Sequence, residues 1–539
     1  MAIDFASGLT PLRELCRASQ ENPDEIFITV DGKSATYAEA FEVVMSVRHG
    51  LAGAGLEPGE RVIIMAPNRL EAVWTWLGVQ AVGAIDAPIS TEAPGAFLRY
   101  LASDLQPKAA VGTRDLLKRL REAAEVDFDL AIVIGPGAEE SPLGADTTHI
   151  AFDDLHRHGG TALSGEVELP SAAAAGTIMY SSGTTGPSKG VVLTQGYFST
   201  LAFVHIELDG FEPGYRIYCV QPLCHVDGRS AVIAALHLRG HVYLGTRFSA
   251  SRFWDEIETH DVDVFYYVGT MIHLIHKQPP RPLRNPGRPR VGIGSATPGA
   301  IQRDFESRFN VELIEGYGMT EFGVLIAQRR GGTAPGHLGD PPAWVQVMVV
   351  DENDDPVPDG EAGQLVARPL APHLHMLGYW GRPEATVAAW QGLWFHTGDV
   401  VRRRPDGHYE YVGRLKDSIR RRGENVSAWE VEQAATRHAD VLEAAAIGVP
   451  SEVGDEDVAL LVVARPGTVL DPIELRGFLA RDLPKYALPR FIEIVNSLPK
   501  TPSERIAKGI VKERGIGPTA FDAEASIRWS SGRAGRPGG

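Results

Sequence analysis

The stretch TIMYSSGTTGPSKGVVLT, residues 177–194, carries more information about the fold than any other part of the sequence. Its first residues, 177–180, are an apolar run that is typical of a buried strand. Small residues follow, and their glycines permit positive φ, so that consecutive backbone N–H groups can converge on an anion. Hydroxyl groups and the ammonium of Lys189 add hydrogen bonds and positive charge. The stretch therefore predicts a strand that leads into a polyphosphate-binding loop, although a Gly/Ser-rich surface linker has a similar composition.

This loop differs from a Walker A loop. A Walker A motif places four residues between a glycine and a Gly-Lys-Ser/Thr triplet. Here the fifth residue after Gly183 is Ser188, and Lys189 is followed by Gly190. The sequence therefore predicts a phosphate loop of a different kind.

The composition limits the class of protein. The chain has 539 residues, with 52 Lys and Arg against 69 Asp and Glu, which gives a net charge of −17. This acidic balance argues against a nonspecific nucleic-acid binder, which needs a basic surface. Three cysteines are too few for a disulfide framework or a four-cysteine zinc site. There is no apolar run of the ~20 residues that span a membrane and no signal-peptide pattern, so we expect a soluble, cytoplasmic protein without a membrane span.

Helical and strand patterns alternate through the first 340 residues. Residues 36–55 have apolar side chains at helical spacing after Thr36, which is suited to cap a helix, and residues 61–67 are typical of a buried strand. Such alternation predicts βαβ units around largely parallel sheets. From about residue 345, two β-rich runs surround an acidic turn. The expected fold is therefore α/β, with two α/β subdomains and a small β subdomain followed by a small α+β domain.

Further motifs follow the loop in a fixed order. They are residues 294–298 (GSATP), 315–321 (EGYGMTE), 397–399 (TGD) and 413–417 (GRLKD). Together with the loop, in which Pro187 and Ser188 stand in swapped order, they resemble the AMP-forming adenylating superfamily, which includes acyl-CoA synthetases, luciferase and peptide-synthetase adenylation domains. Within that superfamily, residues 448–450 (GVP), 483–486 (LPKY) and 515–524 (GIGPTAFDAE) most resemble the carnitine/crotonobetaine–CoA ligases.

The resemblance implies which residues bind ATP. The loop, the turn at 294–298 and the ring of Tyr317 would surround the nucleotide, while Asp399 and Arg414 would hold the ribose hydroxyls. The nucleotide-binding residues implied in this way are Ser181, Ser182, Gly183, Thr184, Thr185, Gly186, Lys189, Ser295, Ala296, Thr297, Glu315, Gly316, Tyr317, Gly318, Met319, Asp399 and Arg414.

The resemblance also implies groups that act on the substrates. Thr320 would bond the α-phosphate, and Glu321 would be the protein's metal ligand, because Mg²⁺ commonly combines one or two carboxylates with substrate phosphates. His225, in the segment QPLCHVD (221–227), would stand at the mouth of the acid pocket. Lys416 would be the hinge of a mobile C-terminal domain. The catalytic residues implied are Thr320, Glu321, His225, Arg505 and Lys508.

The last two residues stand in a motif that departs from the family pattern. The closing motif of the family reads Thr/Ser-Gly-Lys, whereas here Glu504 replaces the glycine and Arg505 replaces the lysine. A guanidinium can stabilise negative charge that develops at phosphorus, but it is not a compact point charge like an ammonium. Three alternatives stay open: Arg505 serves, Lys508 substitutes for it, or adenylation is slow or altered.

The resemblance covers about residues 10–525 and implies an AMP-forming ligase. It predicts a large adenylating domain at 1–415, a small mobile domain at 416–525 and a disordered tail at 526–539. A carboxylic acid would react with Mg·ATP to give an acyl-adenylate and pyrophosphate, and the acyl group would then pass to CoA. The loop at 423–427 would line the tunnel for the pantetheine arm.

Two other functions stay open. Some members of the superfamily in secondary metabolism adenylate an oxyanion such as nitrite, which then diazotises an aromatic amine, and the altered Arg505 position would suit this. The other is a catalytically decayed binding homologue.

Residues 265–267 (FYY) would wall a pocket for an aromatic acid. The expected partners are a small carboxylate, aromatic or not, and CoA, with no nucleic acid, while the formation of a homo-oligomer is left open.

Overall fold

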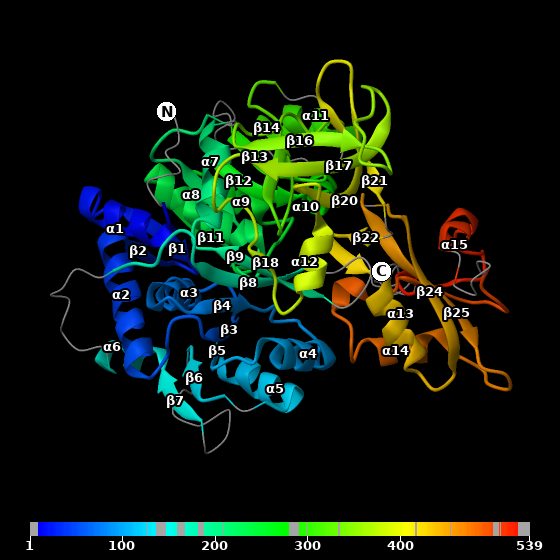
Figure 1. Cartoon of the computed structure of the whole chain (residues 1–539), viewed down its shortest axis with the longest axis horizontal. Coiled ribbons are helices and arrows are strands. Elements are labelled where there is room, and N and C mark those ends of the chain that lie inside the picture. Colours follow the sequence, from blue (N-terminus) through cyan, green and yellow to red (C-terminus); the bar gives the residue numbers. More distant parts are fainter. Residues whose placement is uncertain are drawn as a thin grey trace, which may run out of the picture. The chain divides into compact units, whose positions relative to one another are not determined.

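The computed structural model describes residues 9–126, 128–135, 147–158, 168–181, 188–207, 210–279, 290–297, 299–332, 335–415, 418–452, 454–499, 506 and 508–525. The chain divides into two compact units (Figure 1). The larger unit comprises Met1–Thr91, Arg99–Ser181 and Lys189–Leu415. The smaller one comprises Lys416–Gly539 with the short segments Glu92–Leu98 and Ser182–Ser188. The predicted tail at 526–539 lies outside the described residues.

The first sheet of the larger unit contains the two strands that flank the predicted phosphate loop. Its eight strands lie in the order β18-β9-β8-β4-β3-β5-β6-β7. The strands from β8 to β7 in that order are parallel, and β9 and β18 continue the sheet antiparallel. Their bounds are β3 (Arg61–Met65), β4 (Ile85–Pro88), β5 (Ala109–Gly112), β6 (Leu130–Val133), β7 (Thr148–Ala151), β8 (Ala175–Ser181), β9 (Lys189–Thr194) and β18 (Gly378–Tyr379). The predicted strand at 177–180 is confirmed, because it lies within β8.

The second sheet of the larger unit has the order β15-β14-β13-β12-β10-β11-β1-β2. It is parallel from β14 to β1, with an antiparallel strand at each edge. Its strands are β1 (Ile26–Val30), β2 (Lys33–Thr36), β10 (Arg216–Cys219), β11 (His241–Leu244), β12 (Val264–Val268), β13 (Arg290–Ser295), β14 (Val311–Met319) and β15 (Gly323–Ala327). The prediction of largely parallel sheets is confirmed.

Helices connect these strands, and the apolar faces of several meet in one core. Helix α2 begins after Thr36, as predicted, because the Thr36 hydroxyl and the Glu39 carboxylate cap each other's backbone N–H groups. The rings of Trp76 on α3 and Phe198 on α7 lie edge to face at 5.9 Å. The helices are α1 (Pro11–Glu21), α2 (Tyr37–Gly53), α3 (Leu70–Val82), α4 (Gly95–Leu105), α5 (Arg114–Ala124), α6 (Phe152–His158), α7 (Tyr197–Glu207), α8 (Val226–Leu238), α9 (Phe253–Thr259), α10 (Gly269–His276) and α11 (Gly299–Phe309).

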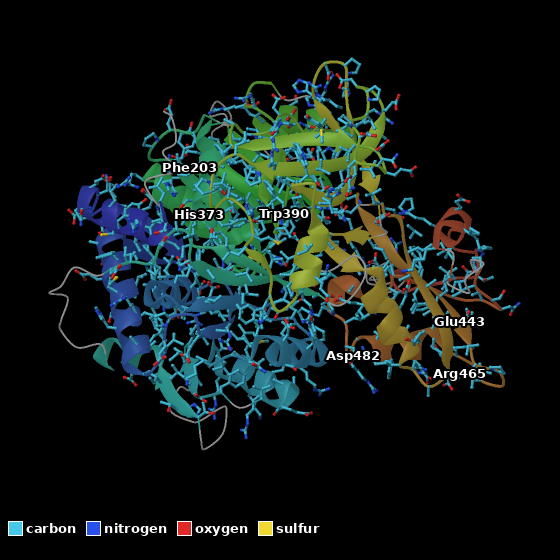
Figure 2. The ribbon with its side chains drawn as sticks, in the orientation of Figure 1. Phe203, His373, Trp390, Glu443, Arg465 and Asp482 are labelled. Atoms are coloured by element: carbon cyan, nitrogen blue, oxygen red, sulfur yellow. The ribbon has the colours of Figure 1, made fainter. Side chains whose placement is uncertain are left out.

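A five-stranded antiparallel sheet forms the predicted β subdomain. It consists of β16 (Val345–Val350), β17 (Ala362–Pro369), β19 (Trp390–Gln391), β20 (Trp394–Arg403) and β21 (Tyr409–Arg414). Helix α12 (Pro383–Ala389) lies between β18 and β19 in the chain. The ring of Trp390, labelled in Figure 2, packs against Phe322 and His375, so this sheet is joined to the segment that follows β14.

The smaller unit is an α+β domain with its own core. A hairpin of β22 (Ser418–Arg421) and β23 (Glu424–Ser427) precedes helix α13 (Ala428–Thr436). A four-stranded sheet follows, with the order β24-β25-β26-β27. The strands of this sheet and the helices between them are β24 (Val441–Pro450), β25 (Glu456–Ala464), α14 (Pro472–Leu479), η2 (Lys485–Ala487), β26 (Phe491–Ile494), α15 (Lys508–Arg514) and β27 (Phe521–Asp522). The Arg421 guanidinium is buried and donates hydrogen bonds to Asp457 and to the Leu488 carbonyl.

No helix within the described ranges has the length and apolar character that crossing a membrane requires.

Candidate active site

The hairpin of β8 and β9 positions the two ends of the predicted phosphate loop. Ser181 and Lys189 are paired residues of this hairpin, and residues 182–186 lie outside the described part of the chain. The hydroxyl of Tyr180, the residue before Ser181, donates a 2.7 Å hydrogen bond to the carboxylate of Asp104 on α4. Arg382 donates to the other oxygen of the same carboxylate across 2.9 Å. The strand end that leads into the loop is therefore hydrogen-bonded to α4 through Tyr180.

Lys189 and Glu321 both contact one tyrosine, Tyr379. The ammonium of Lys189 lies 4.7 Å from the ring centroid of Tyr379, and the Tyr379 hydroxyl donates a 3.1 Å hydrogen bond to Glu321 Oε1. Burial, together with the nearby Glu321 carboxylate, raises the pKa of Tyr379, so the hydroxyl keeps its proton and remains a donor. Sequence reasoning missed Tyr379, because β18 is too short to show a periodic pattern.

Thr320 and Glu321 form the turn between β14 and β15. Met319 pairs with Gly323 in this hairpin, and Thr320 and Glu321, the first two of the three turn residues, are half-buried. A Cβ on Gly318 would lie 2.2 Å from the carbonyl oxygen of Gly323, so a side chain at that position would collide with backbone. The glycine therefore permits the tight turn that presents Thr320 and Glu321.

The turn at 295–297 lies beside the motif that contains Glu315 and Tyr317. Gly294 and Glu315 are register partners in the parallel pair β13–β14, so the carboxyl ends of the two strands meet at one edge of the sheet. Ala296 has φ +55°, a strained value for a residue with a side chain, and the Thr297 and Tyr267 hydroxyls share a 2.6 Å hydrogen bond. Residues of both predicted adenine motifs are thus adjacent.

Tyr317 contacts the residue that was predicted to hold the ribose. Its hydroxyl donates a 2.6 Å hydrogen bond to Asp399 Oδ2, and Tyr411 donates across 3.4 Å to Oδ1. Asp399 is 1% exposed, and its backbone is paired with that of Arg414 in the β20–β21 ladder. A ribose hydroxyl that binds Asp399 would therefore replace the hydroxyl of Tyr317.

His225 stands at the start of α8, in a segment that is held by two polar side chains. Asn68 accepts from the Leu223 backbone N–H across 3.1 Å, and Arg229 Nε donates to the Leu223 carbonyl across 2.9 Å. Arg229 also forms an ion pair with Asp86 on β4, and the two side chains are 1% and 0% exposed. The sequence signal for this pair is Asp86, the one charged residue of the otherwise apolar strand β4.

The prediction that residues 265–267 together wall an acid pocket is wrong. They lie on β12, where successive side chains point to opposite faces. Phe265 is fully buried with its ring 5.2 Å from that of Phe253, and Tyr266 packs in the other core. Of the three, Tyr267 bonds a predicted site residue, Thr297.

The residues at the β14–β15 turn suit a metal ion that takes most of its ligands from a bound phosphate compound and water. Within the described ranges no group of three or more His, Cys, Asp or Glu residues could hold a metal ion. Glu321 offers one carboxylate next to the Thr320 hydroxyl, which fits Mg²⁺, because that ion often takes one or two carboxylates and completes its shell with phosphates and water.

Comparisons with known proteins agree with this geometry. The family model for the AMP-binding enzymes matches residues 15–380, and that for the C-terminal domain of AMP-binding enzymes matches residues 430–505. The chain belongs to the AMP-binding enzyme family. The resemblance inferred from the motifs is therefore confirmed, and so are the expected fold class and the activity class, an adenylate-forming ligase.

Individual relatives of this AMP-binding enzyme cover nearly its whole length. A sulfoacetate–CoA ligase of Cupriavidus necator is 30% identical over 91% of this chain and 95% of its own. A crotonobetaine/carnitine–CoA ligase of Salmonella agona is 26% identical over 90% of this chain and 95% of its own. The solved amide bond synthetase of Marinactinospora thermotolerans is 25% identical with a TM-score of 0.81, covering 94% of this chain and 99% of that one.

Of the two alternative closing-motif cations in the C-terminal domain, Lys508 is among the described residues. Lys508 Nζ lies 2.8 Å from Glu432 Oε1, and Glu432 on α13 also accepts from the Ala446 backbone N–H across 2.8 Å. Arg505, the other alternative, and the predicted hinge Lys416 lie outside the described residues, as does the side chain of Arg414.

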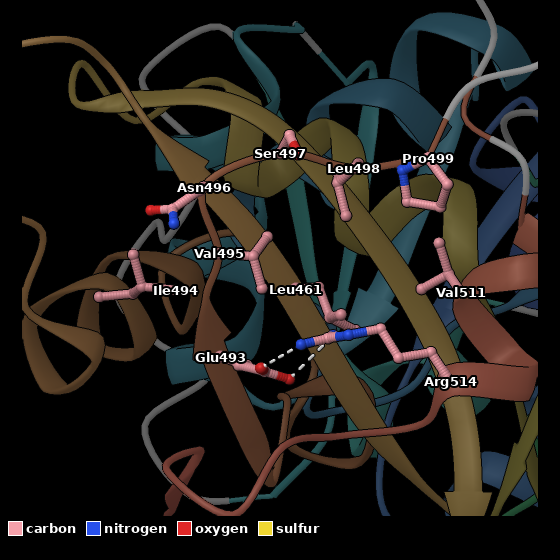
Figure 3. A pocket seen from close by; sticks show the side chains of 10 residues that line it. All are labelled: Leu461, Glu493, Ile494, Val495, Asn496, Ser497, Leu498, Pro499, Val511 and Arg514. Carbon is pink, nitrogen blue, oxygen red and sulfur yellow. Dashed lines mark hydrogen bonds and ion pairs between the residues drawn. The ribbon is translucent and has the colours of Figure 1, made fainter.

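The chain that enters the closing motif borders a pocket of about 300 Å³ (Figure 3). Leu498 and Pro499 line this pocket, together with Glu493 and Arg514. Arg514 on α15 donates to Glu493 on β26 across 2.6 Å. This bond joins α15, which follows the closing motif, to β26, which precedes it.

Proposed function

We propose that this AMP-binding enzyme activates a carboxylic acid with Mg·ATP and transfers the acyl group to CoA. The observation that supports it best is the contact of Tyr379 with both Lys189 and Glu321, because it keeps a cation and a carboxylate next to the predicted phosphate loop. The transfer to CoA is supported by the 30% identical relative, whose name is that of a CoA ligase.

In the first half-reaction an oxygen of the acid attacks the α-phosphorus of ATP. The bond from phosphorus to the bridging oxygen of pyrophosphate breaks, and that electron pair leaves with pyrophosphate. Lys189 would neutralise phosphate charge, Thr320 would bond the α-phosphate, and His225 would border the acid. Mg²⁺ held by Glu321 would neutralise further charge on the phosphates.

For the closing motif we propose Arg505 as the cation that acts at the α-phosphate. The argument is the ion pair of Lys508, whose ammonium is bound by Glu432 at 2.8 Å. To act on the nucleotide, Lys508 would have to give up this partner. Arg505 stands at the family's lysine position, and a guanidinium can stabilise the negative charge that develops at phosphorus.

In the second half-reaction the thiol sulfur of CoA attacks the acyl carbon, and the C–O bond to AMP breaks. The thiol proton is released, and AMP leaves with the bond's electron pair. We propose that the C-terminal domain turns about Lys416 between the half-reactions, withdrawing Arg505 and bringing in the loop at 423–427. Lys416→Pro should then slow thioester formation more than adenylation, and an equal loss of both would contradict the hinge.

The experiment is a screen of carboxylic acids, aromatic acids included, by pyrophosphate release. The accepted acid is then incubated with ATP in the presence and absence of CoA, and the product is identified by mass. An acyl-CoA supports the proposal. A product formed with an added amine in place of CoA would point instead to amide formation, the activity named for the 25% identical solved relative. Turnover of nitrite with an aminoaryl acid would point to diazotisation, and a lack of any ATP–pyrophosphate exchange to a decayed homologue.

A further inference from the structure

A short segment after β17, residues 376–380, contains β18 and runs along β9 at the edge of the first sheet. It contacts both the turn that contains Glu321 and the β8–β9 hairpin. At its start the Met376 N–H donates to the Glu321 carbonyl across 2.8 Å. At its end the Trp380 N–H donates to the Gly190 carbonyl across 2.7 Å. Between these two bonds, Tyr379 pairs with Val191 of β9. We call residues 376–380 the β18 segment.

Side-chain hydrogen bonds hold the β18 segment in this register. The Tyr379 N–H donates to the Thr386 hydroxyl across 2.9 Å, and the Trp380 indole donates to the Asp104 carbonyl across 3.0 Å. Asp104 is also the residue whose carboxylate binds Tyr180 at the base of the phosphate loop. The position of the Tyr379 side chain is therefore determined from both ends of the segment.

The ring and the hydroxyl of Tyr379 contact two different predicted site residues, Lys189 and Glu321. The ring face takes the ammonium of Lys189 at 4.7 Å, a cation–π contact, and the hydroxyl donates to Glu321 Oε1 at 3.1 Å. One side chain thus contacts both the ammonium that is predicted to meet the phosphates and the carboxylate that is predicted to hold the metal.

We propose that Tyr379 is a positioning residue of the nucleotide site, whose hydroxyl orients Glu321 toward the metal and whose ring holds Lys189 toward the phosphates. The proposal rests on the roles proposed above for Lys189 and Glu321. It assigns the two tasks to separate parts of one side chain, so that the task of the hydroxyl can be removed while the task of the ring is kept.

Two variants separate the tasks. Tyr379→Phe keeps the ring and removes the hydroxyl, whereas Tyr379→Leu removes both. Manganese binding to the protein with a non-hydrolysable ATP analogue is measured by electron paramagnetic resonance, and metal-free analogue binding by calorimetry. Since a hydrogen bond to a charged group is at stake, Tyr379→Phe should weaken manganese binding about tenfold and leave metal-free binding unchanged. Tyr379→Leu should weaken both.

Tyr37→Phe is the matched control, because it also removes a hydroxyl that is buried, one that bonds the carbonyls of Ala235 and Gly240. It should lower the melting temperature without changing either binding constant. If both Tyr379 variants behave like this control, or if Phe and Leu weaken both constants equally, the proposal is overturned.

Glu321→Gln and Lys189→Ala distinguish this failure from a failure of the proposed function. If Glu321→Gln leaves manganese binding intact and Lys189→Ala leaves analogue binding intact, the roles of these two residues are wrong and the proposal falls with them. If both variants lose binding and the Tyr379 variants do not, only the role of Tyr379 is wrong.

Discussion

The hydroxyl of Tyr317 donates a 2.6 Å hydrogen bond to the carboxylate of Asp399, a residue 82 positions later in the chain. The bond joins the GYGMTE motif on β14 to the TGD motif on β20. It also covers the carboxylate, since Asp399 is 1% exposed. A nucleotide whose ribose binds Asp399 must therefore compete with a hydroxyl of the protein.

The first prediction concerns this competition. Tyr317→Phe keeps a ring for adenine and removes the competing hydroxyl, so ATP should bind about two- to tenfold more tightly, the range expected for one neutral hydrogen bond. Asp399→Asn should weaken ATP binding. Calorimetric titration with ATP measures both, and weaker binding by Tyr317→Phe would contradict a direct competition at Asp399.

The second prediction separates the two closing-motif cations. Arg505→Ala should lower ATP–pyrophosphate exchange about a hundredfold, as expected when a charge stabiliser of the transition state is lost. Lys508→Ala and Glu432→Gln should both retain exchange and lose a small amount of stability, because the pair they break is partly exposed.

Lys512→Ala is the control for Lys508→Ala, since Lys512 on the same helix pairs with Glu456 at 3.5 Å. Loss of exchange in Lys508→Ala, with exchange retained in Arg505→Ala, would reverse the assignment. If neither variant loses exchange, the closing motif has been misidentified.

The third prediction tests the buried pair of Asp86 and Arg229. Removing one partner leaves an uncompensated charge, so Asp86→Ala should cost about 3–5 kcal/mol of unfolding free energy. The double variant Asp86→Leu with Arg229→Met should cost less, because neither charge remains. Urea denaturation measures both, and a double variant less stable than Asp86→Ala would contradict this account.

The same pair should affect the acid site. Arg229 donates to the Leu223 carbonyl two residues before His225, so loss of the guanidinium loosens the segment that ends in His225. We expect the double variant to raise KM for the acid more than KM for ATP. Equal changes in the two KM values would mean that the pair acts on stability alone.

The fourth prediction concerns acid stability. His237 on α8 is buried against the ring of Phe203, a residue that Figure 2 labels, and its Nδ1 lies 3.8 Å from Glu14. Burial, with Arg239 and Arg17 adding to it, lowers the pKa of His237 to about 3. The unfolded chain, with a pKa near 6.5, takes up the proton first as the pH falls. Stability should therefore be lost between about pH 6.5 and 3.

His237→Gln removes this titration, so the unfolding free energy should depend less steeply on pH between about pH 6.5 and pH 5. Urea denaturation at several pH values measures the slope. An unchanged slope in the variant would assign the acid sensitivity to other groups.

Local patterns in the sequence predicted the features that depend on neighbouring residues. Thr36 is predictable as a helix cap from the helical spacing of the apolar residues after it, and the partner that it binds, Glu39, is only one turn away. The apolar run at 177–180 is predicted as a strand for the same reason, and it lies within β8. Family membership also followed from short motifs, since each motif is a local arrangement of backbone and side chains around a nucleotide.

The contacts between distant segments were decided by the tertiary structure. Residues 265–267 looked like one aromatic wall, but the alternation of side chains on β12 sends them to two cores. Tyr379 reaches Glu321 and Lys189 because β18 pairs with β9 in one register, and Tyr317 covers Asp399 because β14 and β20 meet. Such pairings are selected by the packing of whole sheets, so a local stretch of sequence contains the residues of the site but not their partners.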